Sequence, residues 1–407
     1  MTRGRPGPAG TSLVLLVATA LVALNLRPGA STVGPVLDEI RHGLGMSGGA
    51  AGALTGLPGL CFGVGGALAV GLGRRVGAAG GIAIGLLLAA VGLLLRPLVD
   101  APAAFLVLSA VALLGMAVGN VLVPAWVKSH RGHEVRLMTL YGTGLIVGGA
   151  VGSLLAAPAA AAGGWRTGLG VWGVGAAVAV PLWWWLSRTE RRRVVVGTDV
   201  DAPPSAHVVR SPTALAMTVL FGLQSMHAYI QMGWLPQIYR DAGLSAATAG
   251  SMQALLAAVT IIGGLTMPGV IARGRGLRPM IVVLGLLLVL GHGGLIAAPA
   301  TTPWVWAVAL GLSGFAFPLV IALITARTRS PLVTARVSGF VQPVGYLLAG
   351  AGPLLVGVLH DATGGWTVVL WVLAATAVPF VWAGLRAVRE ASVDDELTDH
   401  ARDGVRA

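Results

Sequence analysis

The stretch ALVALNLRPGASTVGP, residues 20–35, lies in the first long apolar run of the chain, yet it contains an asparagine, an arginine and two prolines. A charged side chain at the centre of a membrane helix costs about 2.5–3.5 kcal/mol on insertion scales. If this run crosses a membrane, the fold must offset that cost. The surrounding sequence indicates whether it does.

The composition of the chain indicates whether this segment lies in water or in a membrane. Of the 407 residues, 56% are hydrophobic and only 10% are charged, and apolar runs of about 20 residues recur along the whole chain. The pattern predicts an all-α membrane protein with twelve transmembrane helices. We expect them near residues 12–37, 48–72, 79–96, 102–128, 135–160, 165–187, 212–239, 246–271, 279–298, 303–326, 333–359 and 365–386.

The basic residues predict the orientation of the chain. A net charge of +12 could suggest a nucleic-acid partner, but the 27 basic residues follow the predicted loops. Only four fall on the predicted outer side, namely Arg41, Arg96, Arg166 and Arg240, and Arg27 alone is intramembrane. Because inner loops of membrane proteins are rich in Lys and Arg, we expect a multi-pass protein of the cytoplasmic membrane with both termini in the cytoplasm. We therefore expect the protein to be surrounded by the lipid bilayer and to have no nucleic-acid partner.

Two polar segments divide the chain. Residues 188–210 contain Pro-Pro and read as a cytoplasmic linker, and residues 390–407 are acidic and read as a disordered tail. The predicted parts are an amino-terminal tail at 1–11, a six-helix bundle at 12–187, the linker, a second bundle at 211–389 and the tail. The first run could also pass for a signal peptide, but eleven further spans follow it. The single cysteine, Cys61, excludes a disulfide framework within the chain.

The two halves also show a weak internal repeat. The dipeptide Gly43-Leu44 matches Gly243-Leu244, and Gly164-Trp165 matches Gly365-Trp366, at offsets of about 200 residues. Each match is weak alone because glycine is abundant. Their common offset, with a linker at the midpoint, indicates duplication of a six-helix unit.

Twelve helices in two parallel six-helix repeats resemble the major facilitator superfamily. The loop GLGRRVGAAGG at 71–81 keeps the glycines and arginines of that superfamily's usual loop, without its aspartate. A narrower resemblance is to the cyanate permease and nitroimidazole transporter family. Four segments support it: ALNLRPGASTVGP in the first helix, GNVLVPAWVK at 119–128, GLQSMHAYIQMGWLPQIYRDAGLS at 222–245 and QPVGYLLAGAGPLLVGVLHDATGGW at 342–366. The resemblance implies transport of a small solute, often anionic or heterocyclic.

The intramembrane arginine can now be interpreted. Arg27 lies 15 residues after Ser12, which is about 22 Å along a helix, in a hydrocarbon layer about 30 Å thick. Pro28 lacks a backbone N–H, so the helix should bend or loosen at this point. Irregular backbone at that depth is tolerated where it lines a cavity. No carboxylate is predicted at the depth of Arg27, so we expect the guanidinium to meet a solute in a midplane cavity. The alternative is that Arg27 only caps backbone carbonyls or holds a neighbouring helix.

The repeat supplies further candidates in the second half. An offset of 200 carries Arg27 onto His227 and Asn25 onto Ser225, and His227 is the best-placed group for proton coupling. His292 is the rival histidine, but its GHGG setting favours close packing. Tyr141 adds an amphipathic ring. The predicted substrate-binding residues are Asn25, Arg27, Asn120, Gln224, His227, Tyr229, Gln231, Trp234, Gln342 and Tyr346. For the polar residues outside the first helix, interhelical hydrogen bonding is the alternative.

The predicted function is alternating-access transport of a small anion or polar heterocycle, by a monomer without a cofactor. A drug exporter of the same superfamily is the alternative, and a large aromatic-lined pocket would favour it. A membrane-embedded enzyme is disfavoured. No cluster of His, Asp, Glu or Cys with metal-ligand or nucleophile spacing falls inside the predicted spans, so no metal site is expected.

Overall fold

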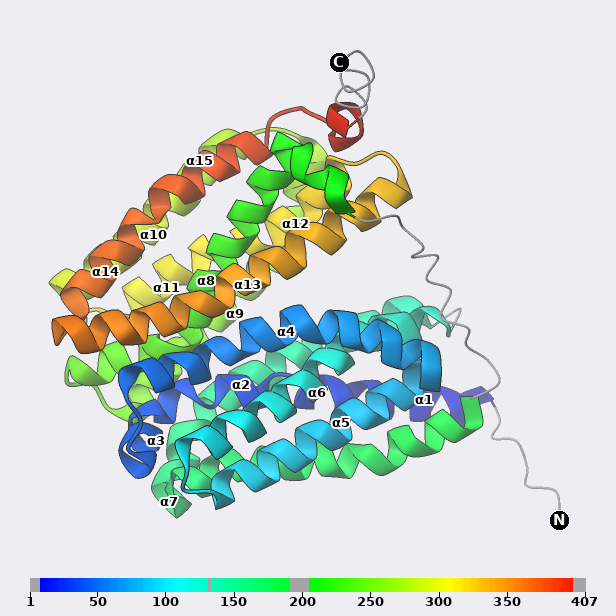
Figure 1. The fold of residues 1–407 in the computed structure, drawn as a ribbon, viewed down its shortest axis with the longest axis horizontal. Helices are drawn as coiled ribbons and strands as arrows, with labels where there is room; N and C mark the ends of the chain where they lie inside the picture. Colours follow the sequence, from blue (N-terminus) through cyan, green and yellow to red (C-terminus); the bar gives the residue numbers. More distant parts are fainter. Residues whose placement is uncertain (1–7, 131–132, 191–204, 398–407) are drawn as a thin grey trace. The chain divides into compact units, whose positions relative to one another are not determined.

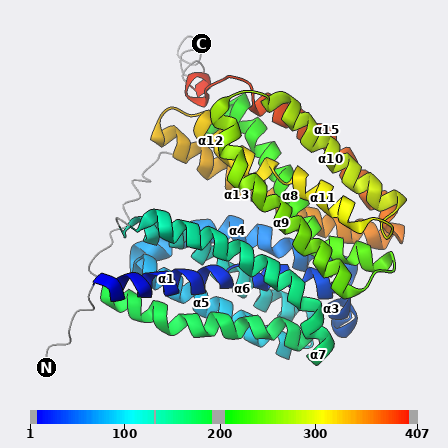
Figure 2. The same cartoon turned by 180° about the vertical axis from the view of Figure 1, so that it is seen from behind.

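The computed structural model describes residues 8–130, 133–190 and 205–397, and within those ranges it contains helices and no strand (Figure 1, and from behind in Figure 2). The prediction of an all-α protein is confirmed for this part of the chain. Parts of the predicted tails and linker, at residues 1–7, 191–204 and 398–407, lie outside it.

The helices follow the apolar runs. The amino-terminal half contains α1 (Pro8–Asn25), α2 (Pro28–Ser31), η1 (Gly34–Val36), α3 (Leu37–Leu44), α4 (Gly48–Val76), α5 (Ala78–Leu95), η2 (Arg96–Leu98), α6 (Pro102–Lys128) and α7 (Glu134–Glu190). The carboxyl-terminal half contains η3 (Ser205–Arg210), α8 (Pro212–Asp241), α9 (Ala246–Arg273), α10 (Leu277–Ala297), α11 (Pro303–Ser313), α12 (Ala316–Ala326), α13 (Pro331–Thr363), α14 (Trp366–Ala375) and α15 (Ala377–Ala387).

Nine helices of the described residues are long and apolar enough to cross a membrane, or ten if the bent pair within α4 counts as one span. One of the nine, Arg136–Thr189, is 54 residues long and includes the non-helical residues Gly163 and Gly164. It therefore covers two of the predicted spans. The 30-residue α8 is not among the nine, and it is the helix that contains Gln224, His227 and Gln231. The count of twelve stays a prediction.

The chain divides into two compact units. The first consists of residues 1–36 and 64–197. In it α5 packs on α6 and α7 through glycines: a Cβ atom at Gly115 would lie 2.2 Å from the carbonyl oxygen of Gly85. Two fully buried indoles, Trp126 and Trp183, meet edge to face with ring centroids 4.7 Å apart. The Trp183 N–H donates to the carbonyl of Ala18 at 3.2 Å, which ties α7 to α1.

The second unit consists of residues 37–63 and 198–407 and thus includes α3 and the first half of α4. Its core lies between α8, α10, α12, α13 and α15, around the fully buried Phe221 and Phe380. Ion pairs hold α3 in this unit. Arg240 contacts Glu39 at 2.7 Å and Asp38 at 3.6 Å. The division in the middle of α4 arises because α3 contacts α8 and because Gly52 and Gly56, in the first half of α4, lie against the backbone of α13. The predicted boundary at the linker stays a prediction.

The carboxyl-terminal segment corrects one expectation. A disordered tail was predicted from residue 390, but Ala391 to Leu397 fold back onto the second unit. Val393 is fully buried, and its N–H donates to the carbonyl of Arg327 at 2.9 Å. The Glu396 carboxylate accepts from the Ser211 hydroxyl and from the N–H and hydroxyl of Thr213, at the start of α8. The prediction rested on the absence of regularly spaced apolar residues after residue 390. The segment is held instead by a helix cap and one buried valine.

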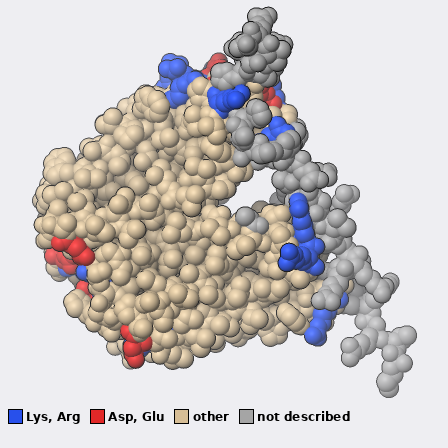
Figure 3. Space-filling view, in the orientation of Figure 1, with Lys and Arg blue, Asp and Glu red and all other residues tan. Residues whose placement is uncertain are grey.

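Charged side chains lie near the ends of the helices on the face that Figure 3 shows, and the flanks visible there are uncharged. The repeat is visible in the backbone as well. Gly77 and Gly276 have φ of 80° and 73°, and Gly164 and Gly364 have φ of 80° and 66°. Members of each pair lie about 200 residues apart and both have the positive φ that favours glycine, although ψ differs, for example 165° at Gly77 and 12° at Gly276. This agrees with the predicted duplication.

Candidate functional site

The first membrane helix is interrupted where the sequence predicts it. The helix α1 ends at Asn25 and α2 begins at Pro28, with Arg27 between them at φ −122° and ψ −38°. The Arg27 carbonyl accepts from the N–H groups of Ala30 and Ser31, each at 3.1 Å, and so begins α2. Its side chain is exposed on the first unit, whereas Leu26 and Pro28 beside it are buried. The prediction of a break at Pro28 is confirmed.

Glycines of α7 fix the position of the broken segment. A Cβ atom at Gly148 would lie 2.5 Å from the carbonyl oxygen of Leu24, and one at Gly152 would lie 2.6 Å from the Ser31 hydroxyl. At Gly149 a Cβ atom would be in ordinary contact, 3.5 Å, with the Cβ atom of Arg27. The backbone of α7 therefore approaches both sides of the interruption, and the stem of Arg27 lies against it.

Two predicted residues of the first unit belong to one polar group. The Tyr141 hydroxyl of α7 donates to Asn120 of α6, 3.2 Å from its side-chain oxygen and 3.3 Å from its backbone oxygen. The amide of Asn120 in turn donates to the carbonyl of Met116 at 3.0 Å. The charge of Arg27 acts electrostatically on the Tyr141 hydroxyl. Tyr141 of α7 and Asn120 of α6 are thus hydrogen-bonded partners, and Arg27, in the break between α1 and α2, is close enough to act on Tyr141 through its charge.

Asn25 lies apart from this group. Its side-chain amide donates to the carbonyl of Leu21 at 2.8 Å, and a Cβ atom at Gly175 would lie 2.6 Å from its side-chain oxygen. Asn25 therefore faces the second half of α7. In this structure its side chain packs against a neighbouring helix. For amides inside a membrane, such structural contacts are the alternative to solute binding.

In the second unit, His227 is enclosed. Its side chain is fully buried, its Nε2 atom lies 2.7 Å from the Thr376 hydroxyl, and its ring centroid lies 5.3 Å from that of His292. The two histidines, treated as rivals in the sequence, are neighbours here. His292 contacts the carbonyl of Leu288 through Nδ1 at 2.8 Å. No local pattern in the sequence pointed to Thr376, which is 149 residues from His227.

The other predicted residues of α8 and α13 are also largely buried. Trp234 is fully buried and donates to the carbonyl of Pro353 at 3.0 Å. Tyr229 and Tyr346 have ring centroids 6.4 Å apart, and Gln342 donates to the Ser338 hydroxyl at 2.6 Å. Gln224 and Gln231 are 2% and 4% exposed. Tyr229 and Tyr346 form a pair. His227 lies two residues before Tyr229 on α8, and because successive helical positions differ by about 100°, its side chain points away from that pair.

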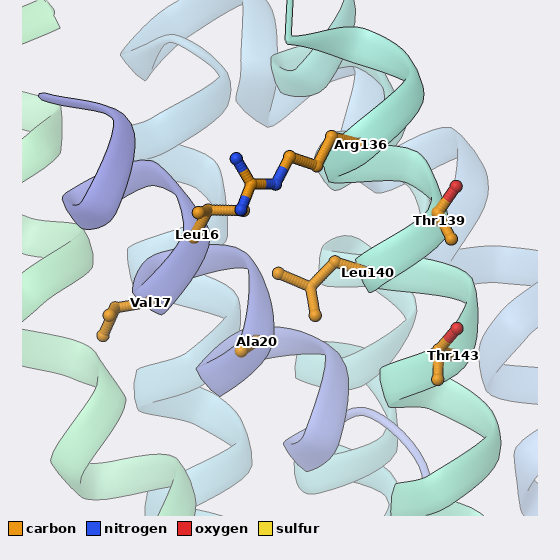
Figure 4. A pocket seen from close by; sticks show the side chains of 7 residues that line it. All are labelled: Leu16, Val17, Ala20, Arg136, Thr139, Leu140 and Thr143. Carbon is orange, nitrogen blue, oxygen red and sulfur yellow. The ribbon is translucent and has the colours of Figure 1, made fainter. Parts of the chain in front are cut away.

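A cavity of about 690 Å³ lies on the first unit between α1 and the first half of α7. Its lining residues are Leu16, Val17, Ala20, Arg136, Thr139, Leu140 and Thr143. Figure 4 shows Arg136 extending from α7 toward Leu16 on α1. The prediction of binding residues missed this cavity. The spacing of 136, 139, 140 and 143 at steps of three, one and three residues could have shown that these α7 residues share a helix face.

Comparison with known proteins gives matches over most of the chain. The family model described as Major Facilitator Superfamily matches residues 15–351. An uncharacterized transporter of Bacillus subtilis is 33% identical over 93% of this chain and 94% of its own length. The 2-nitroimidazole transporter of Escherichia coli is 32% identical over 94% and 97%, and its cyanate transport protein is 33% identical over 86% and 91%. A crystal structure of the nucleoside transporter NupG shares the fold, with a TM-score of 0.74 at 13% identity over 93% of this chain and 98% of that chain.

Proposed function

Since the chain belongs to the Major Facilitator Superfamily and is a secondary transporter, we propose that its solute is a small anion or a polar heterocycle that binds at Arg27. The observation that carries this proposal is the exposed guanidinium at the interruption between α1 and α2. A membrane helix that is broken at a charged residue is the form in which transporters of this kind build midplane sites.

The neighbours of Arg27 suit such a solute. A guanidinium offers two parallel N–H groups to a carboxylate or another planar anion. The Tyr141 hydroxyl and the Asn120 amide lie in the same polar group and offer hydrogen bonds to the remaining polar atoms of a solute. The names of two relatives, a cyanate transporter and a 2-nitroimidazole transporter, fit a small planar solute.

The first test replaces Arg27. In the Arg27→Ala variant we expect binding of a recognised solute to weaken by roughly 10- to 100-fold, because a charge-assisted hydrogen bond is lost. Arg27→Lys should recover little, since an ammonium lacks the planar fork. Because the side chain is exposed, both variants should insert and fold. Uptake into proteoliposomes of cyanate, benzoate and 2-nitroimidazole measures transport, and the shift in melting temperature with each compound measures binding.

Arg75, an exposed arginine in the last turn of α4, provides the matched control. Arg75→Ala should keep both transport and the solute-dependent thermal shift. If Arg27 only caps backbone groups, Arg27→Ala should lower the melting temperature and still show the full solute-dependent shift. That pattern would overturn the site.

We propose His227 as the proton-coupling group, on the basis of its burial and its contacts with Thr376 and His292. Histidine is the side chain whose charge changes most readily near neutral pH. His227→Gln should abolish the stimulation of uptake by an imposed pH gradient, while exchange of labelled for unlabelled solute at equal pH continues. His292→Gln is the comparison. Undiminished stimulation in the His227→Gln variant would exclude His227 as the coupling residue.

A further inference from the structure

We propose that the cavity between α1 and α7 is a second binding site, in which an aromatic or heteroaromatic monocarboxylate places its carboxylate on Arg136. The site rests on the proposed function, because it would hold the solute in the same half of the transporter before or after its contact with Arg27. It concerns Arg136, Thr139 and Thr143, none of which belongs to the Arg27 group.

The chemistry of the lining selects the ligand. Of the seven lining residues only Arg136 is charged, so the site matches a single negative charge. Leu16, Val17, Ala20 and Leu140 form an apolar wall, which would remain wetted beside a small inorganic anion and would be covered by a flat ring. The hydroxyls of Thr139 and Thr143 lie one helical turn apart and can bond to a second polar atom of the ligand (Figure 4).

The position of the cavity links it to Arg27 without merging the two sites. On α1, Val17, Ala20 and Leu24 follow at steps of three and four residues and share one helix face, on which Val17 and Leu24 are exposed and Ala20 is half-buried. Arg27 follows just beyond the end of α1 and is exposed as well. On α7, Arg136 precedes Gly149, the neighbour of Arg27, by 13 residues, which is about 20 Å along the helix. One benzoate-sized molecule cannot span that distance. A solute on Arg136 and a solute on Arg27 would therefore occupy successive positions along the length of α7.

The alternative is that Arg136 only reflects the excess of basic residues in inner loops. A cysteine reporter separates the two explanations. In a Cys61→Ser background, the Thr139→Cys variant is treated with a sulfonate-bearing and a trimethylammonium-bearing methanethiosulfonate, and the ratio of the two reaction rates measures the local potential. Arg136→Gln should lower the ratio of anionic to cationic rate by roughly fivefold or more, because one nearby positive charge is removed. Arg75→Gln should leave the ratio unchanged.

Binding is measured with the same reporter. Benzoate should slow the modification of the Thr139→Cys variant, benzamide should not, and Arg136→Gln should remove the protection. If the cysteine at 139 prevents folding, Thr143→Cys replaces it, since Thr143 lines the same cavity and is exposed. A rate ratio that is insensitive to Arg136→Gln, or an absence of protection by benzoate, would overturn the second site.

The Arg27→Ala variant separates this inference from the proposed function. Benzoate should still protect the reporter in it, because the second site does not include Arg27. Protection that depends on Arg136 together with transport that survives Arg27→Ala would support the second site and remove the first. Protection that needs Arg27 and not Arg136 would do the reverse.

Discussion

At the scale of single residues, Arg27 depends on its neighbours more than on its own helix. Pro28 interrupts the hydrogen bonding of the first span, and glycines of α7 allow a second backbone to lie against the interruption. The exposed guanidinium is the result. The position of this charge therefore depends on the α7 glycines, and a methyl group added at one of them would move it without touching a polar atom of Arg27.

We expect Gly148→Ala to displace α7 from α1. The added Cβ atom would lie 2.5 Å from the backbone oxygen of Leu24, which cannot rotate away as a side chain can. Overpacking of this kind costs about 1–3 kcal/mol. Gly142→Ala is the matched control on the same helix, because nothing lies within 4 Å of its added Cβ atom. Thermal unfolding in detergent should show a lower melting temperature for Gly148→Ala alone, and equal stability of the two variants would contradict the packing described here.

Sequence reasoning located the break at Arg27 because proline acts on its own helix, within a few residues. It proposed that Asn120 reaches a central cavity, which stays a prediction; in the structure Asn120 accepts from the Tyr141 hydroxyl. It could not foresee that Thr376 is the partner of His227, since the two are distant in the chain and threonine is an unremarkable residue in a membrane helix. The binding role of Asn25 stays a prediction; in the structure its side-chain amide donates to the carbonyl of Leu21 on the same helix.

At the scale of helices and segments, the apolar runs predicted the elements well, and the left-handed glycines follow the predicted repeat. The segment after α15 was predicted wrongly. Its contacts are specific and few: a buried valine, a carboxylate at the start of α8, and Asp395 paired with Arg329 at 2.8 Å. Contacts of this kind have no periodic signature, so composition alone suggested a solvated tail.

Truncation distinguishes the folded part of this segment from the rest. A chain ending at Leu397 should unfold at the same temperature as the full chain. A chain ending at Arg389 should lose about 2–5 kcal/mol, because it removes a helix cap of about 0.5–2 kcal/mol and a buried valine of about 1.5–3 kcal/mol. Thermal unfolding of the two truncated proteins measures the difference. Equal melting temperatures would mean that residues 390–397 do not stabilise the second unit.

Glu396→Gln in the full chain tests the cap alone. It keeps Val393 in place and removes the charge that meets the amino end of α8 and the Arg386 side chain, 3.7 Å away. Its melting temperature should fall between those of the two truncated chains.

At the scale of the whole molecule, the superfamily fold was predicted from the repeated apolar runs and their linker, and the family match and the shared fold of NupG confirm it. The membrane orientation is a prediction that follows from the distribution of charge. The positions of the helices do not determine it, because the same bundle can be inserted in either direction and loop arginines set the choice.

Reporter fusions test the orientation. A reporter that requires the outer side of the membrane should be active when fused after residue 98 and silent when fused after residue 200. A reporter that works only in the cytoplasm should show the opposite pattern at the same two positions. Activity of the first reporter at 200 with silence at 98 would reverse the predicted topology.

The cap on α8 also has a consequence for biosynthesis. Glu396, which accepts a hydrogen bond from the Ser211 hydroxyl, is 185 residues further along the chain than Ser211. A ribosome therefore completes helices α8 to α15 before it makes the carboxylate that binds the start of α8. Until then the amino end of α8 has only its own cap, the Ser211 hydroxyl, which accepts from the N–H of Ala214 at 3.0 Å. The second unit can reach its final stability only after Glu396 has left the ribosome.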